Sequence, residues 1–277
     1  MNLPRLHLLA ALLAPFALAA AERTVRFGKI VLTDQYLCDG INAGDFNRDG
    51  KMDVVAGPYW YAGPDFKTKH EFYPMVPQPL EEKPTNSMFS FVYDFNGDGW
   101  PDILVLGRVL FHEANWYQNP GQDAVTNPGT LWKKHFVSPR VFGEAPQFLD
   151  IDGDGKPEIL SISGIAAADK LKQWGWYAPD WSAPEKPWRF VPITGKGDFN
   201  HYYHGEGVGD INGDGRLDLV LNEGWWEQPA EKGKLWIKHP FTLSDDRGGA
   251  QIYVFDVNGD GRNDIITAKN AHGWGLS

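Results

Sequence analysis

The sequence predicts an all-β protein built from consecutive four-stranded antiparallel sheets. Two features of the chain carry this prediction: an acidic, glycine-containing loop recurs five times, and short apolar runs flank every copy of it. The 31 Gly and 20 Pro among 277 residues fit many short strands joined by turns. Because 42% of the residues are hydrophobic, the chain can form a sizeable core and is not a disordered protein.

The loop is a nine-residue segment that aligns without gaps in all five copies. Position 1 is Asp, position 3 is Asn or Asp, position 5 is Asp, position 6 is Gly and position 9 is Asp or Glu. The copies start at Asp45, Asp94, Asp150, Asp210 and Asp256, which are 49, 56, 60 and 46 residues apart. A repeat of this length predicts one structural unit per copy.

Each unit has the same order of strand-like segments around its loop. The segments expected before the loops are Ile41–Gly44, Phe89–Tyr93, Gln147–Leu149, Gly207–Gly209 and Gln251–Phe255. Those expected after the loops are Val54–Ala56, Ile103–Leu106, Ile159–Ser161, Leu219–Leu221 and Ile265–Thr267. In the first four units, an aromatic turn and further strand-like residues follow. A four-stranded unit of roughly 50 residues is typical of a propeller blade, so we expect a β-propeller with about five repeats present.

The loops have the composition of a calcium site. Calcium takes six to eight oxygen ligands, and the curled backbone brings the side chains of positions 1, 3 and 5 together. The glycine at position 6 allows the turn, and position 9 adds a further carboxylate. The expected ligands are Asp45, Asn47, Asp49, Asp53, Asp94, Asn96, Asp98, Asp102, Asp150, Asp152, Asp154, Glu158, Asp210, Asn212, Asp214, Asp218, Asp256, Asn258, Asp260 and Asp264.

Two other kinds of loop have a similar composition. An EF-hand needs a bidentate Glu at position 12 and flanking helices, but position 12 here is Ala56, Val105, Ser161, Leu221 or Thr267, within strand-like residues. Metal-free Asx turns are the other alternative. Five copies with identical spacing favour up to five structural Ca²⁺ ions, which would relieve the repulsion between clustered carboxylates.

The loops and their flanking strands resemble the FG-GAP/VCBS repeats of propellers such as the head of the integrin α-subunit. The resemblance covers roughly Asp39 to the C-terminus. It implies a propeller whose acidic loops join the innermost strand of each blade to the second and hold Ca²⁺. The segments 225–229 and 272–275 are also similar to exported FG-GAP proteins of environmental bacteria and, more distantly, to the propeller of aldos-2-ulose dehydratase-like proteins, which implies sugar chemistry.

Related propellers usually close with seven blades, which leaves two alternatives. The chain forms a small five-bladed ring, in which residues 24–32 supply an outer strand, or it is the front part of a longer, seven-bladed protein. The second alternative is favoured because the fifth unit has no third strand before Ser277. The predicted propeller domain, 22–277, is then incomplete at its C-terminus.

A functional site is expected at the end of the blades opposite the acidic loops, around the central opening. In the segment 201–206, His204 and Glu206 project to the same side and predict acid and base groups or, with His272, metal ligands. Packing inside the ring is the alternative for these groups. Other candidate ligand-binding residues are Trp60, Arg108, Glu144, Glu223, Trp225 and Arg247. The Lys-His pairs at His70, His135 and His239 predict packing in outer strands.

Residues 1–21 have the features of a secretory signal peptide: Arg5, the apolar run from Leu8 to Ala19, and small residues before Glu22. We therefore expect a secreted, periplasmic or cell-surface protein with no membrane span after cleavage. The net charge of −10 argues against nucleic acid. The predicted function is a propeller that binds carbohydrate or an extracellular protein; a sugar-acting lyase, dehydratase or isomerase is the alternative, so enzymatic activity is left open.

Overall fold

The computed structural model describes residues 25–77, 85–107, 113–127, 129–163, 171–197, 199, 204–243, 249 and 251–268. The chain divides into two compact units, Met1–Val31 and Leu32–Ser277. The predicted signal peptide lies outside the described residues. Residues 25–32 contain no strand, and Phe27 is 94% exposed. The expectation that this segment forms an outer strand is therefore wrong for its described residues.

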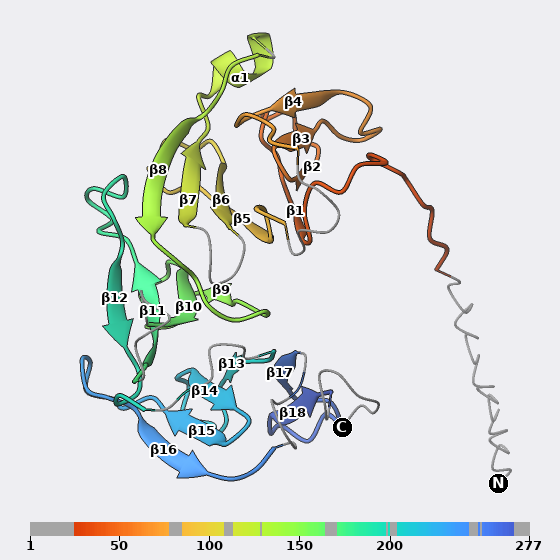
Figure 1. Cartoon of the computed structure of the whole chain (residues 1–277). Helices are drawn as coiled ribbons and strands as arrows, with labels where there is room; N and C mark the ends of the chain where they lie inside the picture. Colours follow the sequence, from red (N-terminus) through yellow and green to blue (C-terminus); the bar gives the residue numbers. More distant parts are fainter. Residues whose placement is uncertain are drawn as a thin grey trace, which may run out of the picture. The chain divides into compact units, whose positions relative to one another are not determined.

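The second unit contains five antiparallel sheets in its described residues (Figure 1). The first contains β1 (Ile41–Gly44), β2 (Asp53–Ala56), β3 (Tyr59–Tyr61) and β4 (Lys69–Glu71). The second contains β5 (Phe89–Tyr93), β6 (Asp102–Leu106), β7 (Ala114–Gln118) and β8 (Lys133–Ser138), with the short helix α1 (Gln122–Thr126) between its last two strands.

The remaining sheets follow in the same order along the chain. The third contains β9 (Phe148–Leu149), β10 (Glu158–Ile162), β11 (Trp174–Ala178) and β12 (Arg189–Pro192). The fourth contains β13 (Gly207–Gly209), β14 (Asp218–Leu221), β15 (Gly224–Glu227) and β16 (Ile237–Pro240). The fifth contains β17 (Ile252–Phe255) and β18 (Asp264–Thr267). The predicted all-β class and the antiparallel four-stranded repeat are confirmed.

Every strand pairs with the next one along the chain within its sheet, so each sheet is a simple meander. The acidic loops join the first strand to the second in every sheet. We call the end of the sheets that carries these loops the loop end. The connections from second to third strands lie at the other end, here called the opposite end, because successive strands run antiparallel.

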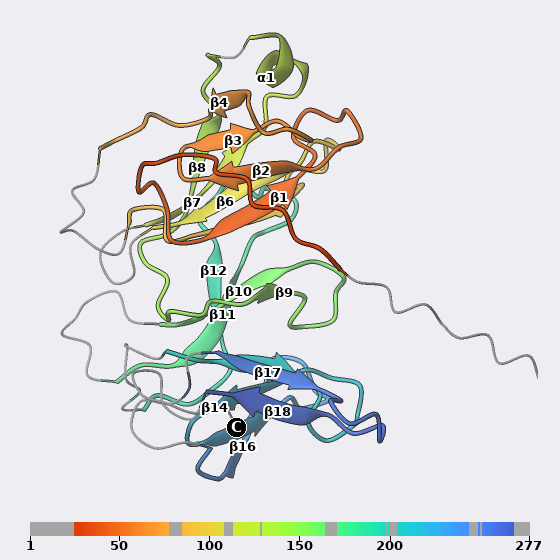
Figure 2. The same ribbon diagram turned by 90° about the vertical axis from the view of Figure 1, so that its right-hand side faces the viewer.

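Consecutive sheets pack on one another through a tryptophan that precedes the fourth strand. The backbone N–H groups of Trp132, Trp188 and Trp236 donate to carbonyl oxygens of the preceding sheet, at 2.8, 3.0 and 2.8 Å. Their side chains are 5–8% exposed and belong to three hydrophobic clusters, each shared between two neighbouring sheets. Figure 2 shows the sheets from the side. The core is therefore divided among the interfaces between sheets.

A second repeated contact lies between the third and fourth strands. Trp60 stacks on His70, Trp116 on His135 and Trp225 on His239, with ring centroids 4.0, 4.2 and 4.1 Å apart. The three histidines thus pack against tryptophans in the sheets, as the repeated Lys-His pairs indicated.

The first strands of neighbouring sheets approach one another closely. Asn42 of β1 donates its side-chain amide to the carbonyl oxygen of Ser90 in β5. In β13, a Cβ added at Gly209 would lie 2.4 Å from the Cβ of Val254 in β17. The backbone of β13 therefore leaves no space for a side chain on this side.

This close approach gives a prediction for stability. The change Gly209→Val should lower the free energy of unfolding by about 1–3 kcal/mol, because the new side chain overpacks the interface with Val254. Chemical denaturation followed by circular dichroism measures the change. Gly195→Ala is the control, because nothing lies within 4 Å of a Cβ at Gly195. Equal unfolding free energies for Gly209→Val and the wild type would contradict the interface.

Candidate functional sites

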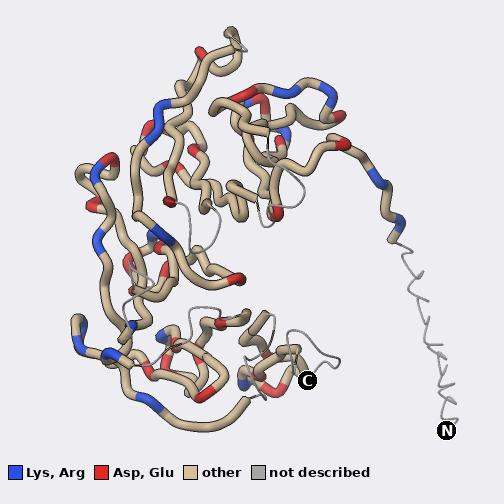
Figure 3. The backbone as a smooth tube through the Cα atoms, viewed as in Figure 1, with Lys and Arg blue, Asp and Glu red and all other residues tan. Residues whose placement is uncertain are grey.

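The five acidic loops share one backbone conformation. In each loop, the carboxylate at position 1 accepts the N–H groups of positions 5 and 6 at 2.7–3.1 Å. The position 6 glycines have φ angles of 82–86°, in the left-handed region where a Cβ is strained. The loops hold 16 of the 36 acidic residues, three in four loops and four in the third (Figure 3).

The carboxylate at position 9 lies at the base of the loop and is buried in the first four sheets. It accepts the backbone N–H of position 2 in all five loops, at 2.7–3.1 Å. Asp53, Asp102 and Asp218 also accept a second N–H, from a residue just after the third strand, at 2.8–2.9 Å. These three carboxylates therefore tie the loop to the end of the third strand.

The third loop departs from this arrangement at its position 9. The second N–H donors in the other sheets are Gly63, Asn119 and Gln228, each three residues after the repeated tryptophan. The corresponding residue of the third sheet is Pro179, which has no N–H. Glu158 thus lacks this second backbone donor and accepts only the N–H of Ile151, and its side chain is one methylene longer than that of Asp.

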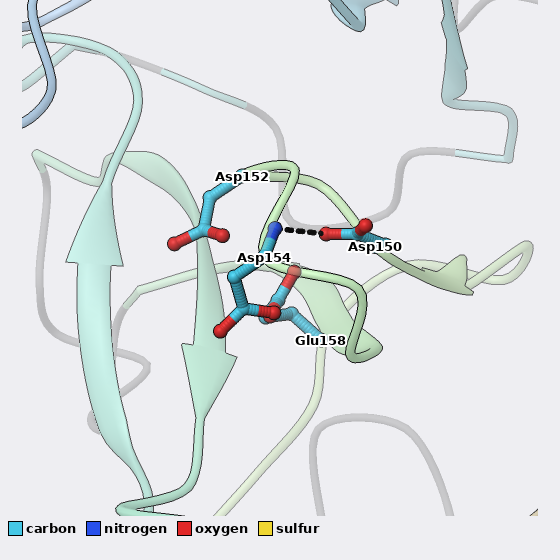
Figure 4. A group of neighbouring side chains, drawn as sticks. All are labelled: Asp150, Asp152, Asp154 and Glu158. Carbon is cyan, nitrogen blue, oxygen red and sulfur yellow. Dashed lines mark hydrogen bonds between the residues drawn. The ribbon is translucent and has the colours of Figure 1, made fainter.

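The third loop consequently gathers four carboxylates (Figure 4). One oxygen from each of Asp150, Asp152, Asp154 and Glu158 lies within 4.8 Å of the others. Among the described residues, this is the one group of three or more acidic, His or Cys side chains at such distances. Hard oxygen ligands in this number suit Ca²⁺.

Asp152 distinguishes the third loop further. In the other four loops, the Asn at position 3 accepts the N–H of position 5 at 2.8–3.1 Å. The buried Oδ1 of Asp152 has no hydrogen-bond partner among the described residues, and the Lys232 ammonium lies 4.0 Å away. The Asp152 carboxylate therefore lacks the hydrogen bond within its own loop that the asparagines at position 3 make in the other four loops.

A second polar cluster lies at the opposite end, before β9 and β13. The Nδ1 atom of His204 is 2.7 Å from a carboxylate oxygen of Glu144. Glu206 is fully buried, and neither of its side-chain oxygens has a hydrogen-bond partner in the described part of the chain. Burial, and then the charge of Glu144, raise the pKa of Glu206 well above its ordinary value. Both effects favour the uncharged, protonated form of Glu206.

The backbone is shaped around Glu206. Gly143 has a φ of 102°, and a Cβ there would lie 2.5 Å from Oε1 of Glu206. The side-chain amide of Gln147 reaches the Glu206 carbonyl oxygen at 3.5 Å. The structure therefore brings together Glu144, His204 and Glu206, three of the residues singled out in the sequence.

The other predicted binding residues are placed differently. Trp60 is 1% exposed and lies in the core between the first two sheets, which favours packing over ligand contact. Trp225 is half-buried against His239, and Glu223 lies in the turn before β15. Arg108, Arg247 and His272 lie outside the described residues, so a metal site involving His272 stays a prediction.

One comparison connects these loops to a known repeat family. Residues 94–161 and 210–267 match the family model of the FG-GAP-like repeat. These two segments therefore match FG-GAP-like repeats, and the resemblance to such repeats found in the sequence is confirmed over them. No curated protein sequence matches the chain.

Among solved structures, the chain is similar to the V. cholerae biofilm matrix protein Bap1, with 20% identity and a TM-score of 0.34. The match covers 66% of this chain and 28% of that one.

The position 9 carboxylates predict a pH dependence of stability. Burial raises the pKa of Asp102 and of Glu158 to about 7, although backbone N–H groups lower both. Both values exceed those of the unfolded chain, about 4. The stability that these groups contribute is present below about pH 4 and is lost as the pH rises through about 7. In EDTA, Glu158→Gln should therefore stabilise the protein more at pH 7.5 than at pH 5.

Urea unfolding of both proteins at the two pH values measures this difference. Comparing the wild type with the variant separates the effect of Glu158 on stability from the effects of His70 and His135. Burial lowers the pKa of these two histidines, so their contribution to stability rises with pH, opposite to that of Glu158. A variant effect that is equal at both pH values, or larger at pH 5, would contradict the assignment.

Proposed function

We propose that this chain is an exported, calcium-binding β-propeller module that binds a carbohydrate or an extracellular protein. The observation that carries the calcium part is the group of four carboxylates in the third loop. Calcium is favoured over softer metals because the loop ligands are oxygen atoms, with no Cys or His among them. The other loops offer three carboxylates and an asparagine each, in the same backbone conformation.

The propeller arrangement is supported by the packing of successive sheets. Each of the second, third and fourth sheets contacts the one before it through the same tryptophan N–H bond. First strands of neighbouring sheets also contact one another, β1 with β5 and β13 with β17. Repeated four-stranded meanders that place their first strands side by side are the arrangement of propeller blades. The domain proposed is 22–277.

An exported location is supported by the predicted signal peptide over residues 1–21. Within the described residues, no helix is both long and apolar enough to span a membrane. The single cysteine, Cys38, excludes an intramolecular disulfide. An exported fold without disulfides depends on its core and on bound ions for stability, which agrees with a structural role for calcium.

We expect the purified protein to contain calcium, and EDTA to lower its melting temperature by several degrees. Binding to the folded state alone raises stability with free ion concentration. The triple change of Asp150, Asp152 and Asp154 to Asn should remove the tightest site, because affinity rises with ligand charge. Elemental analysis and calcium-dependent melting curves measure both effects.

The matched control is Asp65→Asn, which changes an exposed aspartate that pairs with Lys67 outside the loops. Its calcium content and its response to EDTA should equal those of the wild type. A calcium-free wild-type protein whose melting temperature is unchanged by EDTA would refute the calcium module.

A second candidate function is a sugar-acting lyase, dehydratase or isomerase, and Glu206 is the observation that favours it. A carboxyl group whose pKa is raised by burial can act as a proton donor, and His204, oriented by Glu144, can accept a proton. Pairs of groups with such different environments occur at acid–base sites. The catalytic candidates are therefore His204 and Glu206, with His272 as the predicted third residue.

The enzyme hypothesis predicts that Glu206→Gln and His204→Ala abolish turnover on a carbohydrate that the wild type converts. Glu206→Gln should leave the melting temperature equal or higher, because it removes a buried ionisable group without a partner. Product analysis on a glycan panel tests both variants, with exposed Glu231→Gln as the control. Binding of a glycan without product formation by the wild type would reject the enzyme and support a binding module.

A further inference from the structure

The interfaces between consecutive sheets share one construction at their first strands. A Cβ added at Gly207, three positions before the acidic loop, would lie 2.5 Å from Cγ2 of Ile252 in the following sheet. We call the positions one and three before each loop the forward positions, and those two and four before it the backward positions. Forward positions meet backward positions of the following sheet at each interface between described sheets, through the contacts Asn42–Ser90, Gly44–Val92, Phe91–Phe148, Gln147–Glu206 and Gly209–Val254. The side chains at these positions therefore show which face of a sheet is built to be covered.

The forward positions of the fifth sheet are apolar and exposed. They hold Tyr253 and Phe255 of β17 (Figure 1), which are 59% and 63% exposed. Val257, the second residue of the fifth loop, is 57% exposed. The residues at its position in the first three loops are instead buried in clusters shared with the following sheet: Phe46, Phe95 and Ile151. The fifth sheet thus has the apolar side chains of an interface, and they form an exposed patch of the kind that marks interaction sites.

The backward positions of the first sheet are exposed as well. They hold Ala43 and Ile41 of β1, and Ile41 is 62% exposed. Met52, at position 8 of the first loop, is 57% exposed. At that position of the fifth loop, Asn263 donates to the carbonyl oxygen of Asp210 in the preceding sheet at 2.8 Å. The first sheet therefore exposes the side of an interface that the fifth sheet needs, with Met52 on the same face as Ala43 and Ile41.

The two exposed faces are complementary in size. Where β1 meets β5, the small residue is on the forward side, and a Cβ at Gly44 would lie 2.8 Å from Cγ1 of Val92. The exposed faces have the reverse arrangement: Phe255 is at the forward position that corresponds to Gly44, and Ala43 is at the backward position that corresponds to Val92. A large side chain can therefore pack over a small one here, as close packing between sheets requires.

The second sheet shows how an aromatic pair at the forward positions is covered. Phe91 and Tyr93 of β5 pack against Phe148 of the third sheet, with ring centroids 5.1 and 6.4 Å apart. Tyr253 and Phe255 have the same two positions in β17. They can therefore cover the backward face of another sheet in the same way.

A second copy of the chain carries the surface that fits the fifth sheet. Within one chain, the first sheet does not cover the fifth, because Ile41 and Tyr253 stay 62% and 59% exposed. We infer that copies of this chain associate head to tail through two defined faces. The fifth-sheet face of one copy packs against the first-sheet face of the next and continues the interface between sheets. The fifth-sheet face is Tyr253, Phe255 and Val257, and the first-sheet face is Ile41, Ala43 and Met52. This association goes beyond the proposed function and needs neither a sugar nor catalysis.

The interface between copies lacks two polar contacts that occur inside the chain. Thr68 takes the place of the tryptophan that precedes the fourth strand in the second, third and fourth sheets. Asn119 donates its side-chain amide to the carbonyl oxygen of Phe46 in the preceding sheet at 2.9 Å, and the first sheet has Gly63 at that position. The contact between copies is therefore weaker than those within the chain, and we expect a reversible association with a dissociation constant of about 10–100 µM.

Analytical ultracentrifugation of the full chain with calcium, from about 2 to about 500 µM, tests the association. The mean mass of the wild type should rise with concentration above that of one chain. Ile41→Asp and Tyr253→Asp each place a charge in one of the two faces, so each variant alone should associate at least tenfold more weakly. An equimolar mixture should form pairs, because the intact fifth-sheet face of the first variant meets the intact first-sheet face of the second. Such rescue is specific to a head-to-tail contact and shows that both variants are folded.

The matched control is Ile237→Asp, which changes a residue of β16 that is 56% exposed and belongs to neither face. It should associate as the wild type does. A wild type that stays a single chain at every concentration, undiminished association of either face variant, or a mixture that does not pair overturns the inference. A monomeric protein whose melting temperature falls with Tyr253→Asp also overturns it, since the fifth sheet would then pack within its own chain. The calcium test is independent, because EDTA can fail to change the melting temperature while the association persists.

Discussion

The buried carboxylate at position 9 is the interaction on which the rest of each sheet depends. It begins the second strand and accepts the N–H of position 2, which closes the loop. In three sheets it also accepts an N–H after the third strand, so one side chain fixes three strands of a meander. Burying an acidic group is unfavourable, and the two N–H bonds offset part of that cost. A cation bound at the neighbouring carboxylates would offset more of it.

Three residues that differ in the third sheet alter this balance. Pro179 removes the second N–H, Glu158 replaces Asp, and Asp152 replaces Asn. The three differences act together: the position 9 side chain reaches the other carboxylates, and the loop holds one more negative charge. Repulsion among four carboxylates within 4.8 Å favours either protonation or a bound cation. The loop that is least satisfied by its own backbone is therefore the one with the most reason to hold an ion.

The strands and the loops could be predicted from the sequence because both are local. Gly at position 6, the Asp pattern and the apolar runs lie within nine or so residues, and the predicted runs match β1, β6, β10 and β14 closely. The role of Pro179 could not be predicted alone, because it becomes visible only when the units are aligned on the repeated tryptophan. The burial of Glu206 depends on packing between sheets, which no local pattern encodes. Trp60 is an aromatic residue of a type that often binds ligands, but here the neighbouring sheet buries it.

The two ends of the sheets differ in how their buried polar groups are satisfied. At the loop end, backbone N–H groups occupy the carboxylates at positions 1 and 9, and the unpartnered oxygen of Asp152 lies in the third loop, the proposed metal site. At the opposite end, Glu206 and Asn115 keep buried oxygens without partners among the described residues. Native structures rarely leave such groups unpaired without a reason. Since backbone N–H groups satisfy the carboxylates at positions 1 and 9, the unfavourable free energy of unpaired buried oxygens falls largely on the opposite end, where the packing between sheets must offset it.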